Sequence, residues 1–198
     1  MSASLAANRA APDAPPSRNV PQRIAIVRAL LALVWAAALV IAVGDDVPST
    51  SSDVPIAAAA LLASYPAIDV VASIAATLGT DASRRVLRIN GAISALAVAA
   101  IGATAFGADA GATLVAFGSW AAVSGAIQFG AAVRRRREGH QLPMIVSGGL
   151  STIAGISFLA ASGMDDAHLA TVGGYMGLGG LLYLLWAHRS RTAPRAAR

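Results

Sequence analysis

The chain contains no cysteine, which excludes disulfide bonds and thiolate metal sites. It also contains no lysine, so that all 15 basic residues are arginine, a bias that we attribute to genomic base composition. The sequence shows no histidine pair at metal-ligand spacing, no phosphate-binding loop, no nucleophile elbow and no dinucleotide fingerprint. We therefore expect no catalytic residues, no metal and no cofactor, and predict that the protein is not an enzyme.

Charge is scarce as well. Only 13% of the residues are charged and 56% are hydrophobic, whereas soluble domains are about 25% charged. Between Arg88 and Asp109 there are 20 uncharged residues, and between Asp109 and Arg134 there are 24. A helix needs about 20 apolar residues to cross the hydrocarbon core of a bilayer. The sequence therefore predicts an all-α membrane protein in contact with lipid.

We predict a bundle of six transmembrane helices, with the second broken near Pro66. The segment 1–22, which is rich in alanine, proline and serine, is predicted to be a disordered cytoplasmic tail, and the segment 189–198 a basic cytoplasmic tail. The transmembrane domain then covers residues 23–188. Its six predicted helices are 23–43, 54–78, 86–106, 110–133, 142–162 and 169–188.

Arginine lies on one side of these spans only. It occurs near both termini and in two of the five loops, while the other three loops contain aspartate and no arginine. The positive-inside rule then places both termini and the two arginine loops in the cytoplasm. The loop arginines are also candidate anchors to anionic lipid head groups, and they argue against a nucleic-acid-binding face. These residues are Arg84, Arg85, Arg88, Arg134, Arg135, Arg136 and Arg137.

An internal repeat is visible in the apolar segments. Residues 90–94 (NGAIS) match residues 147–151 (SGGLS) at an offset of 57, and residues 67–69 match 126–128 at an offset of 59. At an offset of 55, Gly118, Trp120, Gly125 and Arg134 match Gly173, Tyr175, Gly180 and Arg189. The repeat predicts three helical hairpins in parallel orientation, each beginning and ending in the cytoplasm.

One acidic residue, Asp69, lies well inside a predicted span, where a charge costs roughly 2.5–3.5 kcal/mol. Arg28 of the first helix is the candidate counter-ion, and Asn90 and Gln128 are predicted to lie at a similar depth. The four side chains could form one polar layer next to the bend that Pro66 favours. The layer could hold the helices together as a structural ion pair with amide contacts, or it could bind a solute or move a proton.

Small residues at helical spacing, among them Ser147, Ser151 and Gly155, predict close helix packing or a face for a homo-oligomer. The segment 117–159 resembles the repeat of the HdeD-type acid-resistance membrane proteins, at Gly118, Trp120, Gly125, Arg134, Gly148, Ser151 and Gly155. The resemblance covers the C-terminal two-thirds well and is weaker from Arg28 to Leu78. It implies a six-helix bacterial inner-membrane protein, linked in some members to acid stress and without known catalytic residues. We expect a non-enzymatic role in envelope or acid-stress tolerance; the alternative is a small-solute or proton transporter that uses Asp69.

Overall fold

The computed structural model describes residues 19–44, 46–47, 49–77, 84–138, 141–166 and 169–192. All regular structure in these ranges is helical, as predicted, and six of the helices are long and apolar enough to span a membrane. The elements are α1 (Asn19–Val43), α2 (Ile56–Thr77), α3 (Arg84–Gly107), α4 (Ala110–Arg134), a short 3-10 turn η1 (Arg136–Glu138), α5 (Leu142–Ala161) and α6 (Ala170–Thr192).

Helices α1, α3 and α6 extend further at their arginine-bearing ends than predicted. Helix α1 begins at Asn19, inside the predicted disordered tail, and α6 continues to Thr192, inside the predicted basic tail; residues 1–18 and 193–198 lie outside the described ranges. Helix α3 begins at Arg84, two residues before the predicted start, so that Arg84 and Arg85 belong to the helix together with Arg88. Arginine is a good helix former, and an interfacial layer lies beyond the hydrocarbon core, so a helix can continue past its apolar span.

Pro66 does not interrupt α2. The helix is continuous from Ile56 to Thr77 with Pro66 inside it, so the predicted break is wrong. Proline has no N–H to donate to Leu62 four residues earlier, and neighbouring helices tolerate this loss by burying the site. Pro66 is fully buried in the bundle.

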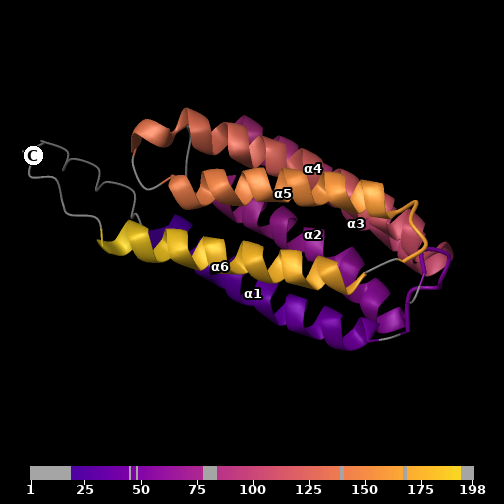
Figure 1. Cartoon of the computed structure of the whole chain (residues 1–198). Coiled ribbons are helices and arrows are strands. Elements are labelled where there is room, and N and C mark those ends of the chain that lie inside the picture. The colour runs from indigo at the N-terminus through magenta and orange to yellow at the C-terminus, as the bar shows by residue number, and fades with distance from the viewer. Residues whose placement is uncertain are drawn as a thin grey trace, which may run out of the picture.

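The six helices form a ring in chain order (Figure 1). Each helix packs against the next one, and α6 closes the ring by packing along α1. The most extensive contacts are those of α4 with α5, α2 with α3, and α1 with α6. These three pairs are offset by one helix from the predicted hairpins, so the parallel hairpin repeat stays a prediction.

Glycines allow two of these pairs to approach closely. A Cβ atom built on Gly118 of α4 would lie 2.7 Å from the carbonyl oxygen of Gly155 in α5. One on Gly180 of α6 would lie 2.9 Å from the carbonyl oxygen of Ala29 in α1. Van der Waals packing between close backbones is a main source of helix association in a bilayer. Gly173, which the repeat aligns with Gly118, also faces α1, where a Cβ atom would lie 3.1 Å from the carbonyl oxygen of Ala36, so the aligned glycines serve the same purpose in α4 and α6.

The outer surface of the bundle is apolar. Ile41 is 81% exposed and Leu96 is 71% exposed, and 25 large hydrophobic residues are exposed in the described ranges. Such a surface is unfavourable in water and suits lipid. The fold is that of a multi-pass membrane protein.

Charge separates the two ends of the bundle. We call "the arginine end" the end where α1, α3 and α5 begin and where the exposed side chains Arg84, Arg85, Arg88, Arg134, Arg135, Arg136 and Arg137 lie. At the opposite end, "the aspartate end", the described acidic residues are Asp46, Asp53, Asp109, Asp165 and Asp166. Asp45 lies outside the described residues.

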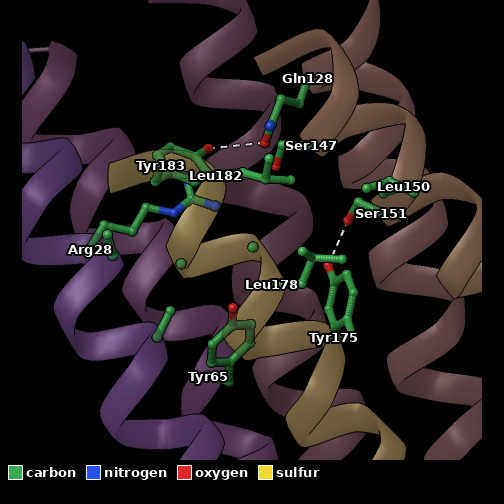
Figure 2. Close-up of a pocket in the computed structure, with 14 residues that line it drawn as sticks. Arg28, Tyr65, Gln128, Ser147, Leu150, Ser151, Tyr175, Leu178, Leu182 and Tyr183 are labelled. Carbon is green, nitrogen blue, oxygen red and sulfur yellow. Dashed lines mark hydrogen bonds between the residues drawn. The ribbon is translucent and has the colours of Figure 1, made fainter. Parts of the chain in front are cut away.

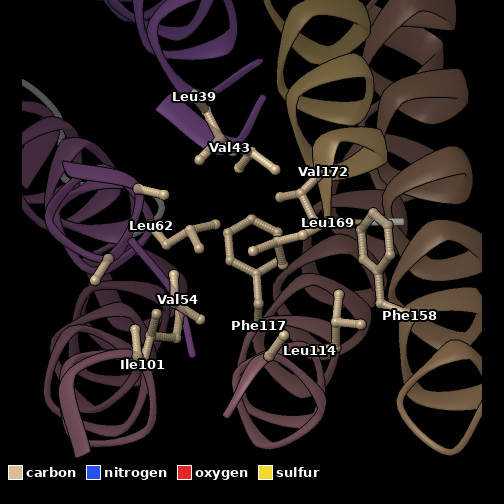
Figure 3. Packing of buried hydrophobic residues seen from close by; sticks show 14 of the residues in the cluster. Leu39, Val43, Val54, Leu62, Ile101, Leu114, Phe117, Phe158, Leu169 and Val172 are labelled. Carbon is tan, nitrogen blue, oxygen red and sulfur yellow. The ribbon is translucent and has the colours of Figure 1, made fainter. Parts of the chain in front are cut away.

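The aspartate half of the bundle is filled by hydrophobic side chains. Phe117 lies at its centre, fully buried, with Leu62 and Leu169 pointing toward it (Figure 3). The loop between α1 and α2 covers this end. The carbonyl of Thr50 accepts a hydrogen bond from Gly111 N (2.8 Å), and its hydroxyl donates to the carbonyl of Met164 (2.7 Å). The aspartate end is therefore closed by both packing and hydrogen bonds.

Candidate functional site

The arginine half of the bundle encloses a cavity of about 300 Å³, which we call the central cavity. All six helices contribute to its lining. Its shallow part includes the exposed residue Arg135, which marks an opening at the arginine end. Its deep part is lined by Tyr65, Trp120 and Tyr175. The cavity thus reaches from one end of the bundle to the middle of the span.

An ion pair lies in the wall of the central cavity. One guanidinium nitrogen of Arg28, from α1, lies 2.6 Å from Oδ1 of Asp69, from α2. The Asp69 side chain is only 7% exposed, whereas that of Arg28 is 25% exposed. The structure therefore brings together the two charged residues that the sequence places inside apolar spans, and it leaves the cation as the more accessible partner.

Tyr183 connects this ion pair to Gln128. The guanidinium carbon of Arg28 lies 4.3 Å from the centroid of the Tyr183 ring, a cation–π contact. The Tyr183 hydroxyl donates a 3.0 Å hydrogen bond to Oε1 of Gln128, as Figure 2 shows. The Gln128 amide donates in turn to the carbonyl of Met144 (3.4 Å). Helices α1, α2, α4, α5 and α6 are thus joined by one polar network, which we call the ion-pair network.

Asn90 lines the same cavity but takes a different partner. Its amide nitrogen donates to the hydroxyl of Ser73 on α2, at 3.3 Å. Of the predicted polar layer, three members are thus linked through Tyr183, and Asn90 forms a separate contact between α2 and α3.

Three tyrosines that were not predicted as site residues also line the cavity. Tyr65, Tyr175 and Tyr183 all line the central cavity and also a smaller adjoining cavity of about 40 Å³, to which α1, α2, α4, α5 and α6 contribute. The internal repeat carried a usable signal for one of them. It aligns Asp69 with Gln128, and its spacing between the fourth and sixth helices aligns Gln128 with Tyr183. The three positions correspond to one another in α2, α4 and α6, and each takes part in the ion-pair network.

A second pair of contacts follows the same repeat. Trp120 donates from its indole nitrogen to the hydroxyl of Ser94, 3.1 Å away on α3. The repeat aligns Trp120 with Tyr175 and Ser94 with Ser151. The Tyr175 and Ser151 hydroxyls form a 2.5 Å hydrogen bond with each other. Residues that match in the sequence therefore make matching contacts between neighbouring helices.

Aromatic rings close the deep end of the central cavity. The ring of Phe117 packs edge-on against those of Trp120 (centroids 5.3 Å apart) and Tyr175 (6.0 Å), and Tyr65 packs edge-on against Trp120 (5.8 Å). Edge-to-face pairs of this kind contribute beyond simple burial, by about 0.5–1.5 kcal/mol each. We call these four residues the aromatic floor, and they separate the cavity from the aspartate end.

The formal charge of the cavity lining is positive. Its charged residues are Arg28, Asp69 and Arg135, and the first two compensate each other. Among the described residues, no group of three histidine, aspartate or glutamate side chains could hold a metal ion. The arrangement suits reversible binding of a small polar molecule.

Comparison with known proteins adds no relative. No family model matches the chain, and neither a curated protein nor a solved structure matches it.

Proposed function

We propose that this protein is a non-enzymatic membrane carrier that takes a small solute into the central cavity from the arginine end and releases it on the other side. The observation that supports this is a cavity of about 300 Å³ inside an apolar bundle, with the charged and polar side chains Arg28, Asp69 and Gln128 in its wall. Ligand sites begin at about this volume and combine apolar walls with a few convergent polar groups. Polar side chains within a membrane are costly and usually mark a solute or ion path.

Transport requires that the cavity open to each side in turn. In the present state the aromatic floor and the loop held by Thr50 close the aspartate end. Carriers commonly hold their solute near the middle of the bilayer, where one barrier can open as the other closes. Trp120, at the deep end of the central cavity, lies near the middle of α4, which agrees with this requirement.

Cysteine accessibility tests the proposal, because the chain has no cysteine of its own. Ser124 lines the central cavity and Ser157 is exposed on the outer face of α5. We expect a charged, membrane-impermeant thiol reagent applied at the arginine end to modify Ser124→Cys at least about tenfold faster than Ser157→Cys, since only a hydrated thiolate reacts. A carrier should also show slower modification of Ser124→Cys from the aspartate end. Modification from the arginine end alone would contradict transport.

The arginine end is proposed to face the cytoplasm of a bacterium, with the arginine side chains on anionic head groups of the inner membrane. Reporter fusions are expected to read as cytoplasmic after Arg137 and as external after Asp109. The same fusions in a variant with Arg134 to Arg137 replaced by glutamine test whether these four positive charges determine the orientation. The reverse pattern in the wild-type chain would overturn the orientation and the direction of uptake.

The second candidate is a non-enzymatic role in envelope or acid-stress tolerance, as the resemblance to HdeD-type proteins implies. The close contacts that Gly118 and Gly180 make within the bundle favour it, because they fit a protein that acts through helix packing in the membrane. A deletion strain would then lose acid survival and regain it with the double variant Arg28→Gln, Asp69→Asn as well as with the wild type, because the double variant leaves no unpaired charge. Rescue by the wild type alone would point back to the cavity.

A further inference from the structure

We infer that the central cavity selects small organic anions, and that Arg28 binds the anionic group. This inference rests on the proposed function, because it assumes that solutes enter the cavity. It adds the chemical class of the solute and the residue that recognises it.

The first support is charge along the path. The mouth of the cavity is lined by Arg135, and the exposed arginines of α3 and of the segment 134–137 lie at the same end. Clefts lined by charge of one sign concentrate ions of the opposite sign by about 10-fold or more. Anions therefore accumulate at the mouth and cations are repelled from it.

The second support is the geometry of Arg28. A guanidinium carries five N–H donors in a planar fork and can serve more than one oxygen partner. The short contact to Asp69 involves a single nitrogen, and a quarter of the Arg28 side chain stays accessible. Arg28 also lines both cavities. A second carboxylate-like group can therefore reach the guanidinium without displacing Asp69.

The third support is the shape of the site around Arg28. A cavity of about 300 Å³ has room for several waters, so it can hold a small solute with part of its hydration shell. The rings of Tyr65, Trp120 and Tyr175 line the deep part. A solute with a carboxylate and a short apolar body can bind with its carboxylate at Arg28 and its apolar body against these rings.

Tryptophan fluorescence tests this selectivity. Trp120 and Trp186 line the central cavity, whereas the indole of Trp35 donates to Ser64 on α2. In a Trp35→Phe background in neutral detergent at constant ionic strength, every remaining indole thus reports on the cavity. We expect iodide to quench about tenfold more strongly than caesium, with neutral acrylamide also effective, and acetate or benzoate to protect against iodide.

Two variants identify the residues responsible. Arg28→Gln combined with Asp69→Asn removes the ion pair without leaving an unpaired charge, and it should abolish protection by acetate. Arg135→Gln changes an exposed residue at the mouth of the cavity and should lower the preference for iodide over caesium. This test does not depend on the folding of the double variant. Protection that survives in a folded double variant would overturn the role of Arg28.

The quenchers also separate this inference from the proposed function. Equal quenching by iodide and caesium, with acrylamide effective, would overturn anion selection and leave an accessible cavity. Failure of all three quenchers would overturn both, because the cavity would be closed to solutes. Iodide preference without protection by acetate or benzoate would also contradict the inference, since no organic anion would then be bound.

Discussion

Replacing Asp69 by asparagine is expected to lower the free energy of unfolding by about 3–5 kcal/mol, the usual cost of breaking a buried ion pair. The substitution keeps the size of the side chain but leaves the Arg28 guanidinium inside the bundle without its carboxylate. Removing one partner is costly for this reason, even where the intact pair adds little net stability. Unfolding of the purified protein in mixed micelles, monitored by circular dichroism, measures the change.

The matched controls isolate the unpaired charge. Asp53→Asn changes an exposed aspartate at the aspartate end and should alter the free energy of unfolding by less than about 0.5 kcal/mol. The double variant Arg28→Gln with Asp69→Asn should recover most of the loss, because no charge is left without a partner. If Asp69→Asn alone unfolds like the wild type, the ion pair does not hold the bundle together.

The substitution Gly155→Ala is expected to separate α4 from α5 and to destabilise the protein by about 3 kcal/mol, at the upper end of the usual cost of overpacking. A Cβ atom at Gly155 would overlap the backbone nitrogen of Ala122 and approach the carbonyl oxygen of Gly118 to 2.6 Å. Neither helix can yield locally, since the obstacles are backbone atoms. The midpoint of thermal unfolding in detergent reports the loss.

Gly149 supplies the control in the same helix. A Cβ atom there would lie 3.7 Å from the nearest atom of Phe129, an ordinary contact, so Gly149→Ala should leave stability unchanged or slightly higher. Equal losses from the two substitutions would show that α5 is sensitive to any added methyl group and that the close approach at Gly155 is not the cause.

The spans could be predicted from the sequence because the bilayer imposes a length. An uncharged segment of about 20 residues can cross the hydrocarbon core, and a helix is the only structure in which a single segment forms all its backbone hydrogen bonds internally. The helix ends were less predictable. Arg84 to Arg88 look like a loop when charge alone is considered, yet arginine continues a helix into the interface without strain.

Those residues of the candidate site that are energetically costly in a membrane could be predicted from the sequence. Asp69 and Arg28 stand out as charges inside apolar spans, so each predicts a partner. Tyrosine carries no such signal because its ring is accepted in lipid and in cores alike, and Tyr183 was therefore missed although it connects Arg28 to Gln128. Asn90 was placed in the layer by depth alone, and depth does not determine which way a side chain points around a helix.

Pairing of the helices depended on shape more than on hydropathy. The loops make α3 and α4 neighbours, but Gly118 and Gly155 bring α4 closest to α5. Pro66 also could not be interpreted from residue type alone. Proline breaks helices in water, but inside α2 it is tolerated because it is buried among neighbouring helices.

The ring closes between its first and last members, and this sets an order of events during synthesis. The surface of α1 that receives Gly173 and Gly180 stays open until the ribosome has delivered α6 to the insertion machinery. Arg28, in contrast, meets Asp69 as soon as α2 has followed α1 into the bilayer. The nascent chain therefore pairs its buried charges early, and the apolar interface between α1 and α6 forms last.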